Sequence, residues 1–287
     1  MKQLRISSSL NLHAPVKNDL SRHIREGLLF HKEMGFDAAD LDMSGMEFSD
    51  GQWRACMEQA VLDAEEAKIK FELCHLPFVG GGAMKDPEAM QKFNEKMYQA
   101  IDAAKILGAD YAVMHPNATS MPLKKFDRAA QYDSVMSHLA PFVEYAAKVG
   151  VSVVVENMRV VNSFVVSHRY CQTPEELCEI ADGLGIGVCW DFGHANISGL
   201  RQSQALAYVG KRLKVLHVND NFAVDDEHLA PFMGNVDWKD AMHGLALADF
   251  QGLFNFEIST GRIPPSARRS LAGYLVEVSK ELISDIK

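Results

Sequence analysis

The sequence predicts a single-domain α/β protein that folds as a (β/α)8 TIM barrel over residues 1–287. Eight short β-rich runs alternate with amphipathic helical segments along the chain. Apolar runs such as VSVVVE at residues 151–156 are typical of strands whose two faces are both buried, as in a parallel sheet. The composition does not shift between the units, which favours one closed barrel over an open sheet with a second domain.

The predicted strands are short, and the spacing between them leaves room for a helix after each one. The run LRISSSL comes first and the run FQGLFNFEIS comes last. The periodicity is clearest from the third strand onward. The strands are predicted at residues 4–10, 37–43, 70–78, 110–116, 151–157, 185–194, 213–220 and 250–259.

Helical periodicity fills the segments between the strands, and local signals mark where several helices begin and end. Glycine just past a helix is the usual left-handed stop, and it stands here at Gly35, Gly108 and Gly150. Thr173, followed by proline and two glutamates, is a good N-cap. Helices are predicted near residues 18–34, 50–68, 87–107, 126–148, from 173 onward, 200–211, 237–247 and 265–285.

The bulk composition fits a globular protein with ample apolar material for one large core, since 47% of residues are hydrophobic and 23% are charged. The formal net charge of -9 disfavours a polyanionic partner such as nucleic acid. Five cysteines without CxxC spacing indicate reduced, mostly buried thiols in a cytoplasmic protein. The N-terminal segment lacks the apolar run of a signal peptide, and no stretch predicts a membrane span.

Polar and ionisable side chains gather where the predicted strands end. Active sites of (β/α)8 barrels lie at this C-terminal face. Carboxylates that follow apolar runs, as Glu156 and Glu257 do, would be costly to bury without a counter-charge. The strand ends and the loop after the seventh strand contribute His75, His115, Glu156, Asn157, Asp191, His194, His217, Asp226, His228 and Glu257.

A divalent metal ion is the counter-charge that these residues suggest. A lone His or Glu at a strand end is more often a hydrogen-bonded structural residue, so the prediction depends on several of them together. A Glu, an Asp, a His and a second Glu from four strands would converge on one mouth. Mixed oxygen and nitrogen ligands suit Mn²⁺, Zn²⁺, Co²⁺ or Mg²⁺. The sequence therefore predicts a metal site at the C-terminal ends of the strands.

These strand ends resemble those of the xylose isomerase-like TIM barrel superfamily, which includes sugar phosphate isomerases and epimerases and is related to endonuclease IV. The resemblance covers nearly the whole chain. It is most specific in VVVEN, GVCWDFGHAN, LHVNDN followed by DEHLAP, and the Glu of the eighth strand. It implies that Glu156, Asp191, His217 and Glu257 are the metal ligands, and that His194 faces the substrate or supports the ligands.

The resemblance implies a metal-dependent isomerase or epimerase of a small sugar, ketose or sugar derivative. The metal would chelate a carbonyl and an adjacent hydroxyl of the substrate and stabilise a developing enediolate. Glu156 and Glu257 would flank the reacting carbon as acid and base. A hydride shift between carbons would use the same ligands, and the sequence does not separate the two mechanisms.

Two other functions stay open. In relatives similar to endonuclease IV, a three-zinc cluster hydrolyses phosphodiesters at abasic DNA, and its further ligands match His75, His115, His194, Asp226 and His228. The basic residues of this chain are scattered rather than arranged in a stripe, which disfavours a nucleic-acid partner. The other alternative is a non-catalytic or partner-dependent metal-binding barrel, and the paired glutamates at the mouth argue against it.

Further residues near the mouth are candidates for substrate binding. Asn157, Arg159 and Arg262 are candidate anchors, and the two arginines could hold a phosphate or carboxylate of the substrate. Trp190 could stack on a sugar, but strand alternation points its side chain opposite to that of Asp191, so we expect it in the core.

The loop after the seventh strand departs from the resemblance. Phe232 and Met233 stand where relatives commonly have a Gly and a Glu, which makes the loop stiffer and more apolar. A close transfer of substrate specificity from those relatives is therefore not expected. The expected partner is a small-molecule sugar, with no membrane, and a homo-oligomer is left open because barrels of this kind often dimerise.

Overall fold

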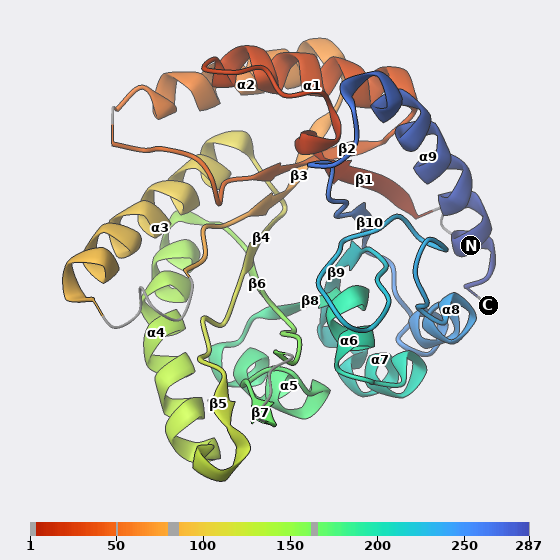
Figure 1. Cartoon of the computed structure of the whole chain (residues 1–287). Helices are drawn as coiled ribbons and strands as arrows, with labels where there is room; N and C mark the ends of the chain where they lie inside the picture. Colours follow the sequence, from red (N-terminus) through yellow and green to blue (C-terminus); the bar gives the residue numbers. More distant parts are fainter. Residues whose placement is uncertain (1–3, 50, 80–85, 162–165, 287) are drawn as a thin grey trace.

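The computed structural model describes residues 4–49, 51–79, 86–161 and 166–286. Eight parallel strands close into a barrel, in the order β1-β10-β9-β8-β6-β4-β3-β2, and helices surround them (Figure 1). The prediction of a single-domain (β/α)8 barrel is confirmed. The barrel strands are β1 (Arg5–Ser9), β2 (Ala38–Asp42), β3 (Lys70–His75), β4 (Tyr111–Met114), β6 (Val153–Glu156), β8 (Gly187–Asp191), β9 (Leu213–Val218) and β10 (Leu253–Phe256).

The helices follow the strands in the predicted alternation. Gly35, Gly108 and Gly150 take the left-handed conformation just past their helices, with φ of 92°, 66° and 81°, as the sequence predicts. Thr173 caps its helix by accepting a hydrogen bond from the Glu176 N–H at 3.4 Å. The helices are α1 (Leu20–Met34), α2 (Trp53–Ala67), α3 (Pro87–Leu107), α4 (Arg128–Val149), α5 (Pro174–Leu184), α6 (Phe192–Ile197), α7 (Gln202–Val209), α8 (Trp238–Leu247) and α9 (Arg268–Ser284).

Strand β8 ends earlier than predicted. The predicted strand runs to residue 194, but Asp191 ends β8 and Phe192 begins the short helix α6. The Asp191 carboxylate accepts a hydrogen bond from the His194 N–H at 2.6 Å and caps this helix. A Cβ at Gly193 would overlap the Asn219 side chain, so glycine permits this tight turn. The turn brings His194 back over the mouth of the barrel.

A small antiparallel sheet outside the barrel was not predicted. It pairs β5 (Met121–Pro122) with β7 (Ser167–His168), and it joins the loops that follow β4 and β6. Two-residue strands carry too little periodicity to be found in a sequence. Because both loops leave the C-terminal ends of barrel strands, this sheet lies at the same end of the barrel as the predicted site.

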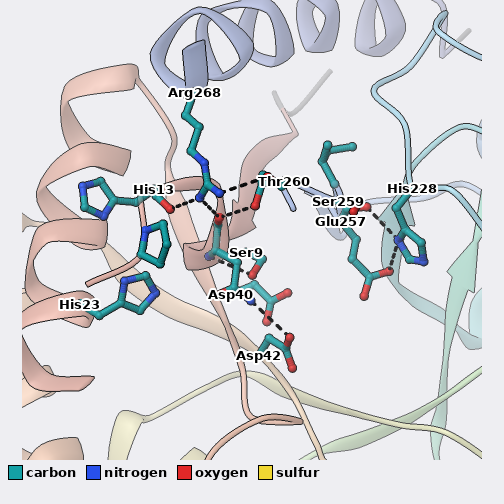
Figure 2. A pocket seen from close by; sticks show the side chains of 13 residues that line it. Ser9, His13, His23, Asp40, Asp42, His228, Glu257, Ser259, Thr260 and Arg268 are labelled. Atoms are coloured by element: carbon teal, nitrogen blue, oxygen red, sulfur yellow. Dashed lines mark hydrogen bonds and ion pairs between the residues drawn. The ribbon is translucent and has the colours of Figure 1, made fainter. Parts of the chain in front are cut away.

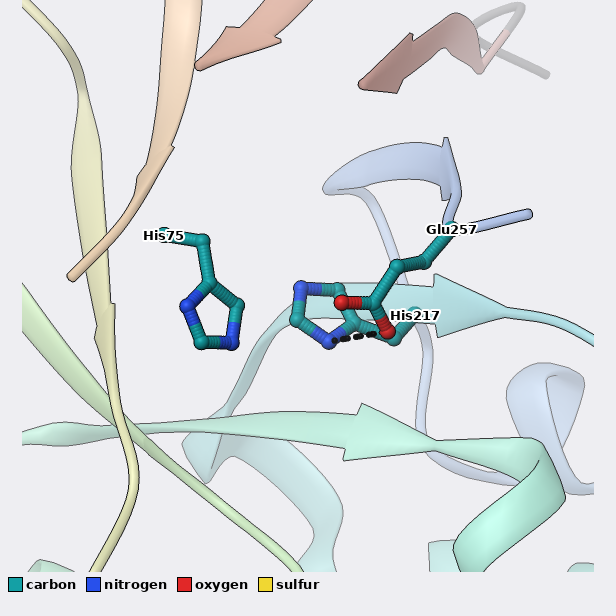
Figure 3. A group of neighbouring side chains, drawn as sticks. All are labelled: His75, His217 and Glu257. Carbon is teal, nitrogen blue, oxygen red and sulfur yellow. Dashed lines mark ion pairs between the residues drawn. The ribbon is translucent and has the colours of Figure 1, made fainter. Parts of the chain in front are cut away.

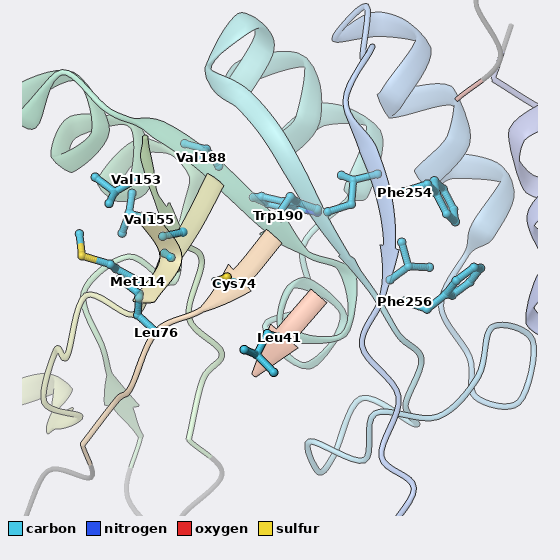
Figure 4. Packing of buried hydrophobic residues seen from close by; sticks show 14 of the residues in the cluster. Leu41, Cys74, Leu76, Met114, Val153, Val155, Val188, Trp190, Phe254 and Phe256 are labelled. Carbon is cyan, nitrogen blue, oxygen red and sulfur yellow. The ribbon is translucent and has the colours of Figure 1, made fainter. Parts of the chain in front are cut away.

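The apolar core has two parts. A large cluster lies between the strands and the helices, and Figure 4 shows side chains of it such as Trp190 and Phe254. Trp190 is fully buried and its indole N–H donates to Gln202 at 2.9 Å, which confirms its predicted place in the core. The second cluster fills the barrel interior with Ala38, Leu73, Val113, Val154, Cys189, Val215 and Leu253.

Two further predictions concern the cysteines and the membrane. The cysteines are mostly buried thiols, as predicted, namely Cys74, Cys171, Cys178 and Cys189, with Cys56 partly buried. Within the described part of the chain, no helix combines the length and the apolar character that crossing a bilayer requires.

Candidate metal centre

The four predicted ligands meet at the mouth of the barrel. Glu156, Asp191, His217 and Glu257 each place one ligand atom within 4.8 Å of the others. His217 Nδ1 lies 3.3 Å from Glu156 Oε1 and 3.2 Å from Glu257 Oε2, and Figure 3 shows the second of these contacts. They come from the ends of four consecutive strands of the barrel, β6, β8, β9 and β10.

Strand alternation explains why these side chains face inward. Val154, Cys189 and Val215 belong to the apolar cluster of the barrel interior, and Glu156, Asp191 and His217 follow them by two residues. The ligands therefore form the next layer toward the C-terminal ends. Glu156, Asp191 and His217 are at most 1% exposed, whereas the Glu257 side chain is 24% exposed. The site is closed from below and opens to the mouth on the Glu257 side.

Two asparagines hold Asp191 in place. Asn219 donates to the Asp191 carboxylate at 2.5 Å. The Asn157 amide accepts from the Asp191 N–H at 2.6 Å and donates to the Asp191 carbonyl at 2.9 Å. Asn157 was predicted as a candidate substrate anchor, but both ends of its amide bond the β8 backbone. These contacts position Asp191, one of the predicted ligands.

Replacing Asn157 by alanine is expected to destabilise the fold, because it leaves backbone groups of Asp191 buried without partners. The cost of such unpaired groups is about 1–3 kcal/mol. Urea unfolding followed by circular dichroism measures this change. Gln91→Ala, which removes an exposed amide from α3, is the matched control. An equal loss of stability in the two variants would contradict the role given to Asn157.

One flank of the ligand cluster is formed by two histidines. His75 Nε2 and His115 Nε2 lie 3.5 Å and 3.2 Å from Glu156 Oε2, and 3.2 Å from each other. These three residues form a second group that could hold a metal ion. Glu156 belongs to both groups and could contribute a carboxylate oxygen to either.

The other flank gathers the remaining predicted residues. Asp226 lies 3.2 Å from His194 Nε2 and 3.3 Å from His228 Nε2, and the three form another group that could hold a metal ion. Arg159 Nε donates to Asp226 at 2.9 Å, so its charge is already paired. The structure thus brings all the predicted ligand residues into one continuous cluster.

Nearby carboxylates raise the pKa of two imidazoles of the site, those of His75 and His194. Burial alone would lower the pKa of His75, but the Glu156 carboxylate, 3.5 Å away, raises it to about 9. Burial also opposes protonation of His194, and Asp191 is the main group that raises the His194 pKa to about 9. A metal ion that binds here must displace protons from such imidazoles.

The pKa values of the two glutamates are lowered by the neighbouring imidazoles. Burial alone would raise the pKa of Glu257, but the charges on His217 and His228 outweigh it and lower the pKa to about 2. Burial also opposes ionisation of Glu156, yet His217 and His115 hold its pKa well below the ordinary value. Both glutamates are therefore ionised at neutral pH, as ligands and proton acceptors must be.

Buried polar atoms without hydrogen bonds show that the residues fit a metal ion. Within the described residues, Glu156 Oε2, Glu257 Oε2 and both ring nitrogens of His217 are buried and make no hydrogen bond. Such atoms are rare in folded proteins because each one costs free energy. His217 Nδ1 lies 3.2 Å from Glu257 Oε2 and 3.3 Å from Glu156 Oε1, and neither contact is a hydrogen bond. A divalent ion would satisfy these atoms, since carboxylate oxygens and imidazole nitrogens are its ordinary ligands.

Two sequence predictions concern residues outside this cluster. Arg262 is exposed in the loop after β10 and does not line the cavity next to Glu257. Phe232 has φ of 67°, which is the left-handed conformation that glycine adopts without strain. Phe232 therefore keeps the backbone conformation expected of the Gly in relatives, and its side chain is 57% exposed.

Two aspartates of β2, Asp40 and Asp42, were not predicted as site residues. Asp40 is 1% exposed, Asp42 is partly buried, and both line a cavity next to Glu257. Burial raises the pKa of Asp40 to about 6, although His217 and His75 act to lower it. The two stand at alternate positions of the strand AADLD, so a period of two would have placed them on the site-facing side.

Comparisons with known proteins agree with this fold. The sequence profile described as xylose isomerase-like TIM barrel matches residues 29–278. An uncharacterized protein of Methanocaldococcus jannaschii is 26% identical over 257 residues, which cover 87% of this chain and 84% of that protein. Solved structures share the fold at lower identity.

A D-allulose 3-epimerase from Methylomonas sp. is 18% identical, with a TM-score of 0.73, over 98% of this chain and 99% of that one. An L-ribulose 3-epimerase is 14% identical, with a TM-score of 0.77, over 99% of this chain and 95% of that one. At these identities the likeness concerns the fold alone. The matched profile spans the strands that carry Glu156, Asp191, His217 and Glu257. The chain belongs to the xylose isomerase-like TIM barrel family.

Proposed function

We propose that the protein is a metal-dependent isomerase or epimerase of a small sugar, ketose or sugar derivative. The observation that carries the proposal is the convergence of four ligand side chains, of which Glu257 also lines a cavity of about 360 Å³. This volume is at the lower end of the range of about 300–1,000 Å³ that is typical of small-molecule sites. Structural relatives that are sugar 3-epimerases support this substrate class. The buried thiols fit an enzyme of the cytoplasm.

Glu156, Asp191, His217 and Glu257 would hold one divalent ion, with Mn²⁺, Zn²⁺, Co²⁺ and Mg²⁺ as the candidates. When bound, such an ion supplies Lewis-acid polarisation of a carbonyl or hydroxyl oxygen. Glu257 is ionised and partly exposed, so its carboxylate can take a proton from a carbon next to the carbonyl.

Glu156 is the second acid/base in this scheme, and its surroundings differ from those of Glu257. It is 1% exposed and lies within 3.5 Å of imidazoles of His75, His115, His194 and His217. Its carboxylate is therefore more enclosed than that of Glu257. Two carboxylates in different surroundings suit the removal of a proton on one face of a carbon and its delivery on the other.

The experiment is a screen of ketoses and their derivatives with Mn²⁺-loaded protein in D2O, followed by ¹H NMR. The expected result is interconversion of one sugar pair, with deuterium from the solvent at the rearranged carbon. Interconversion without deuterium would instead assign a hydride shift to the same ligands. Absence of interconversion for every ketose and aldose tested, with each of the four candidate metals, would contradict the proposed function.

Phosphodiester hydrolysis at abasic DNA is the second candidate, and the two flanking ligand groups favour it. His75, His115 and Glu156 form one group, and His194, Asp226 and His228 form the other. Elemental analysis of protein purified without chelator separates the candidates. One equivalent of metal supports the sugar enzyme, and three equivalents of zinc together with cleavage of an abasic duplex would favour the hydrolase. The net charge of -9 weighs against DNA as the partner.

A further inference from the structure

The cavity beside the metal centre has walls from opposite ends of the chain. One wall comes from β1, β2 and the segment after β1, and the other comes from Glu257 and the residues that follow β10. Figure 2 shows Asp40 and Asp42 on the first side and Glu257 with His228 on the second. A substrate carbon held next to Glu257 would therefore extend the rest of its chain toward β2.

Asp40 offers a hydrogen-bond acceptor that has no partner. The side chain is 1% exposed and lines the cavity. Its Oδ2 accepts from the Asn255 amide at 3.2 Å, and Ser7 donates to the other end of that amide at 2.6 Å. Its Oδ1 is buried and makes no hydrogen bond within the described residues. Since a buried acceptor without a partner is costly, this atom is suited to a hydroxyl group of a ligand.

Asp42 adds a second carboxylate to the same wall. Its Oδ1 accepts from the Ser44 N–H at 2.8 Å, and its Oδ2 accepts from the Asn11 amide at 3.3 Å. Each carboxylate oxygen accepts more than one hydrogen bond, so both atoms keep capacity for a ligand hydroxyl. With Asp40 and Glu257, three carboxylates line one cavity of about 360 Å³.

The cationic side chains that line the cavity are already paired, and His228 lies 3.3 Å from Asp226 Oδ1 and 3.4 Å from Glu257 Oε2. Of the described residues that line it, Arg268 alone is an arginine or lysine. Its guanidinium donates to the backbone carbonyls of Asn11 at 3.0 Å, His13 at 2.5 Å and Thr260 at 3.1 Å. His13 and His23 also line the cavity, and burial is the main cause that lowers the pKa of each imidazole, which favours the neutral form.

We propose that this cavity binds the uncharged, polyhydroxylated end of the substrate, and that the substrate of this protein is a free sugar rather than a sugar phosphate. Hydroxyl groups donate to Asp40 Oδ1 and to Asp42, which are acceptors only. A terminal phosphate in the same place would face the carboxylates of Asp40 and Asp42, and Arg268 is held by backbone carbonyls. The inference rests on the proposed function, because it assumes that the reacting carbon lies next to Glu257.

The test compares matched pairs of ligands on Mn²⁺-loaded protein by isothermal titration calorimetry. The probes are D-fructose with D-fructose 6-phosphate, and D-ribulose with D-ribulose 5-phosphate. The free sugar of at least one pair is expected to bind at least about tenfold more tightly than its phosphate, since like charges across an interface are strongly unfavourable. Equal or tighter binding of the phosphates would overturn the inference, and so would binding of neither class.

Variants that remove one negative charge from the cavity test whether its carboxylates cause the preference for the free sugar over the sugar phosphate. Asp42→Asn keeps the size and the Ser44 contact, and it is expected to weaken free-sugar binding and to reduce the preference over the phosphate by at least about threefold. Asp40→Asn is the second variant, and Asp133→Asn on the exposed face of α4 is the control. An unchanged preference in both cavity variants would overturn the inference. Deuterium exchange in D2O is read separately, so turnover of a sugar phosphate would leave the proposed function standing while this inference fails.

Discussion

The variant Glu257→Gln is expected to lose turnover while keeping the fold. The amide cannot accept a proton from carbon, and it is a poorer ligand for a divalent ion than the carboxylate. General acid–base catalysis contributes about 10²–10⁴-fold, so we expect kcat to fall by about 10³-fold or more. The fold should persist because the Glu257 side chain is partly exposed and its backbone N–H still bonds the Val218 carbonyl at 3.2 Å.

The measurement is kcat for the sugar pair found by the D2O screen, together with a thermal melt. Glu281→Gln on the exposed face of α9 is the control for removal of one negative charge. Metal content per chain is measured in both variants, because loss of the ion would abolish turnover by a different route. Full activity of Glu257→Gln with its metal in place would disprove the scheme with two carboxylates.

Metal removal is expected to abolish turnover and to lower the melting temperature. An ion at 100 times its dissociation constant stabilises the folded state by about 2.7 kcal/mol, which for a chain of 287 residues corresponds to roughly 4–5 °C. Differential scanning fluorimetry of chelated protein and of protein with each candidate metal added back measures the shift. An unchanged melting temperature and unchanged turnover after chelation would mean that Glu156, Asp191, His217 and Glu257 do not hold a metal.

The stabilisation by metal should grow as pH rises from about 6 to 8. The pKa of His75 is raised to about 9, so its ion pairs stabilise the metal-free fold below about 6.5 and are lost as pH rises through about 9. The pKa of Glu257 is lowered to about 2, so its contribution is present above about 4.5 and is lost as pH falls through about 2. The metal-free protein is therefore most stable near pH 4.5–6.5, whereas metal binding is favoured by the loss of imidazole protons at higher pH. A gap between the two melting temperatures that narrows toward pH 8 would contradict this account.

The barrel and the convergence of the candidate ligands could be predicted because they depend on local patterns. Apolar runs followed by Glu156 or His217 identify a buried strand and its end in one short segment. The end of β8 was misplaced because a hydrogen bond from the His194 N–H to the Asp191 carboxylate begins a helix there. The alternation of apolar residues gives no indication of such a bond. The role of Asn157 was missed for a similar reason, since its amide bonds the backbone of a different strand.

The two aspartates of β2 were not predicted for a different reason. Asp40 and Asp42 lie on β2, where the alternation AADLD is short and the apolar signal is weak. Their importance comes from residues that are distant in sequence, because the cavity wall opposite them follows β10. The Arg268 guanidinium donates hydrogen bonds to the backbone carbonyls of residues 11, 13 and 260. No sequence pattern predicts these bonds, because two of the three partners are distant along the chain.

The apolar cluster inside the barrel also determines how ligands travel. Ala38, Leu73, Val113 and their neighbours fill the interior below the metal centre, and at the far end Glu72 pairs with Arg5. Among the described residues these side chains close the barrel interior, so the site opens toward the C-terminal ends of the strands. Reactant and product must use the same entrance one after the other. A reversible rearrangement carried out here therefore shows mutually exclusive occupancy, and each of the two isomers is a competitive inhibitor of the conversion of the other.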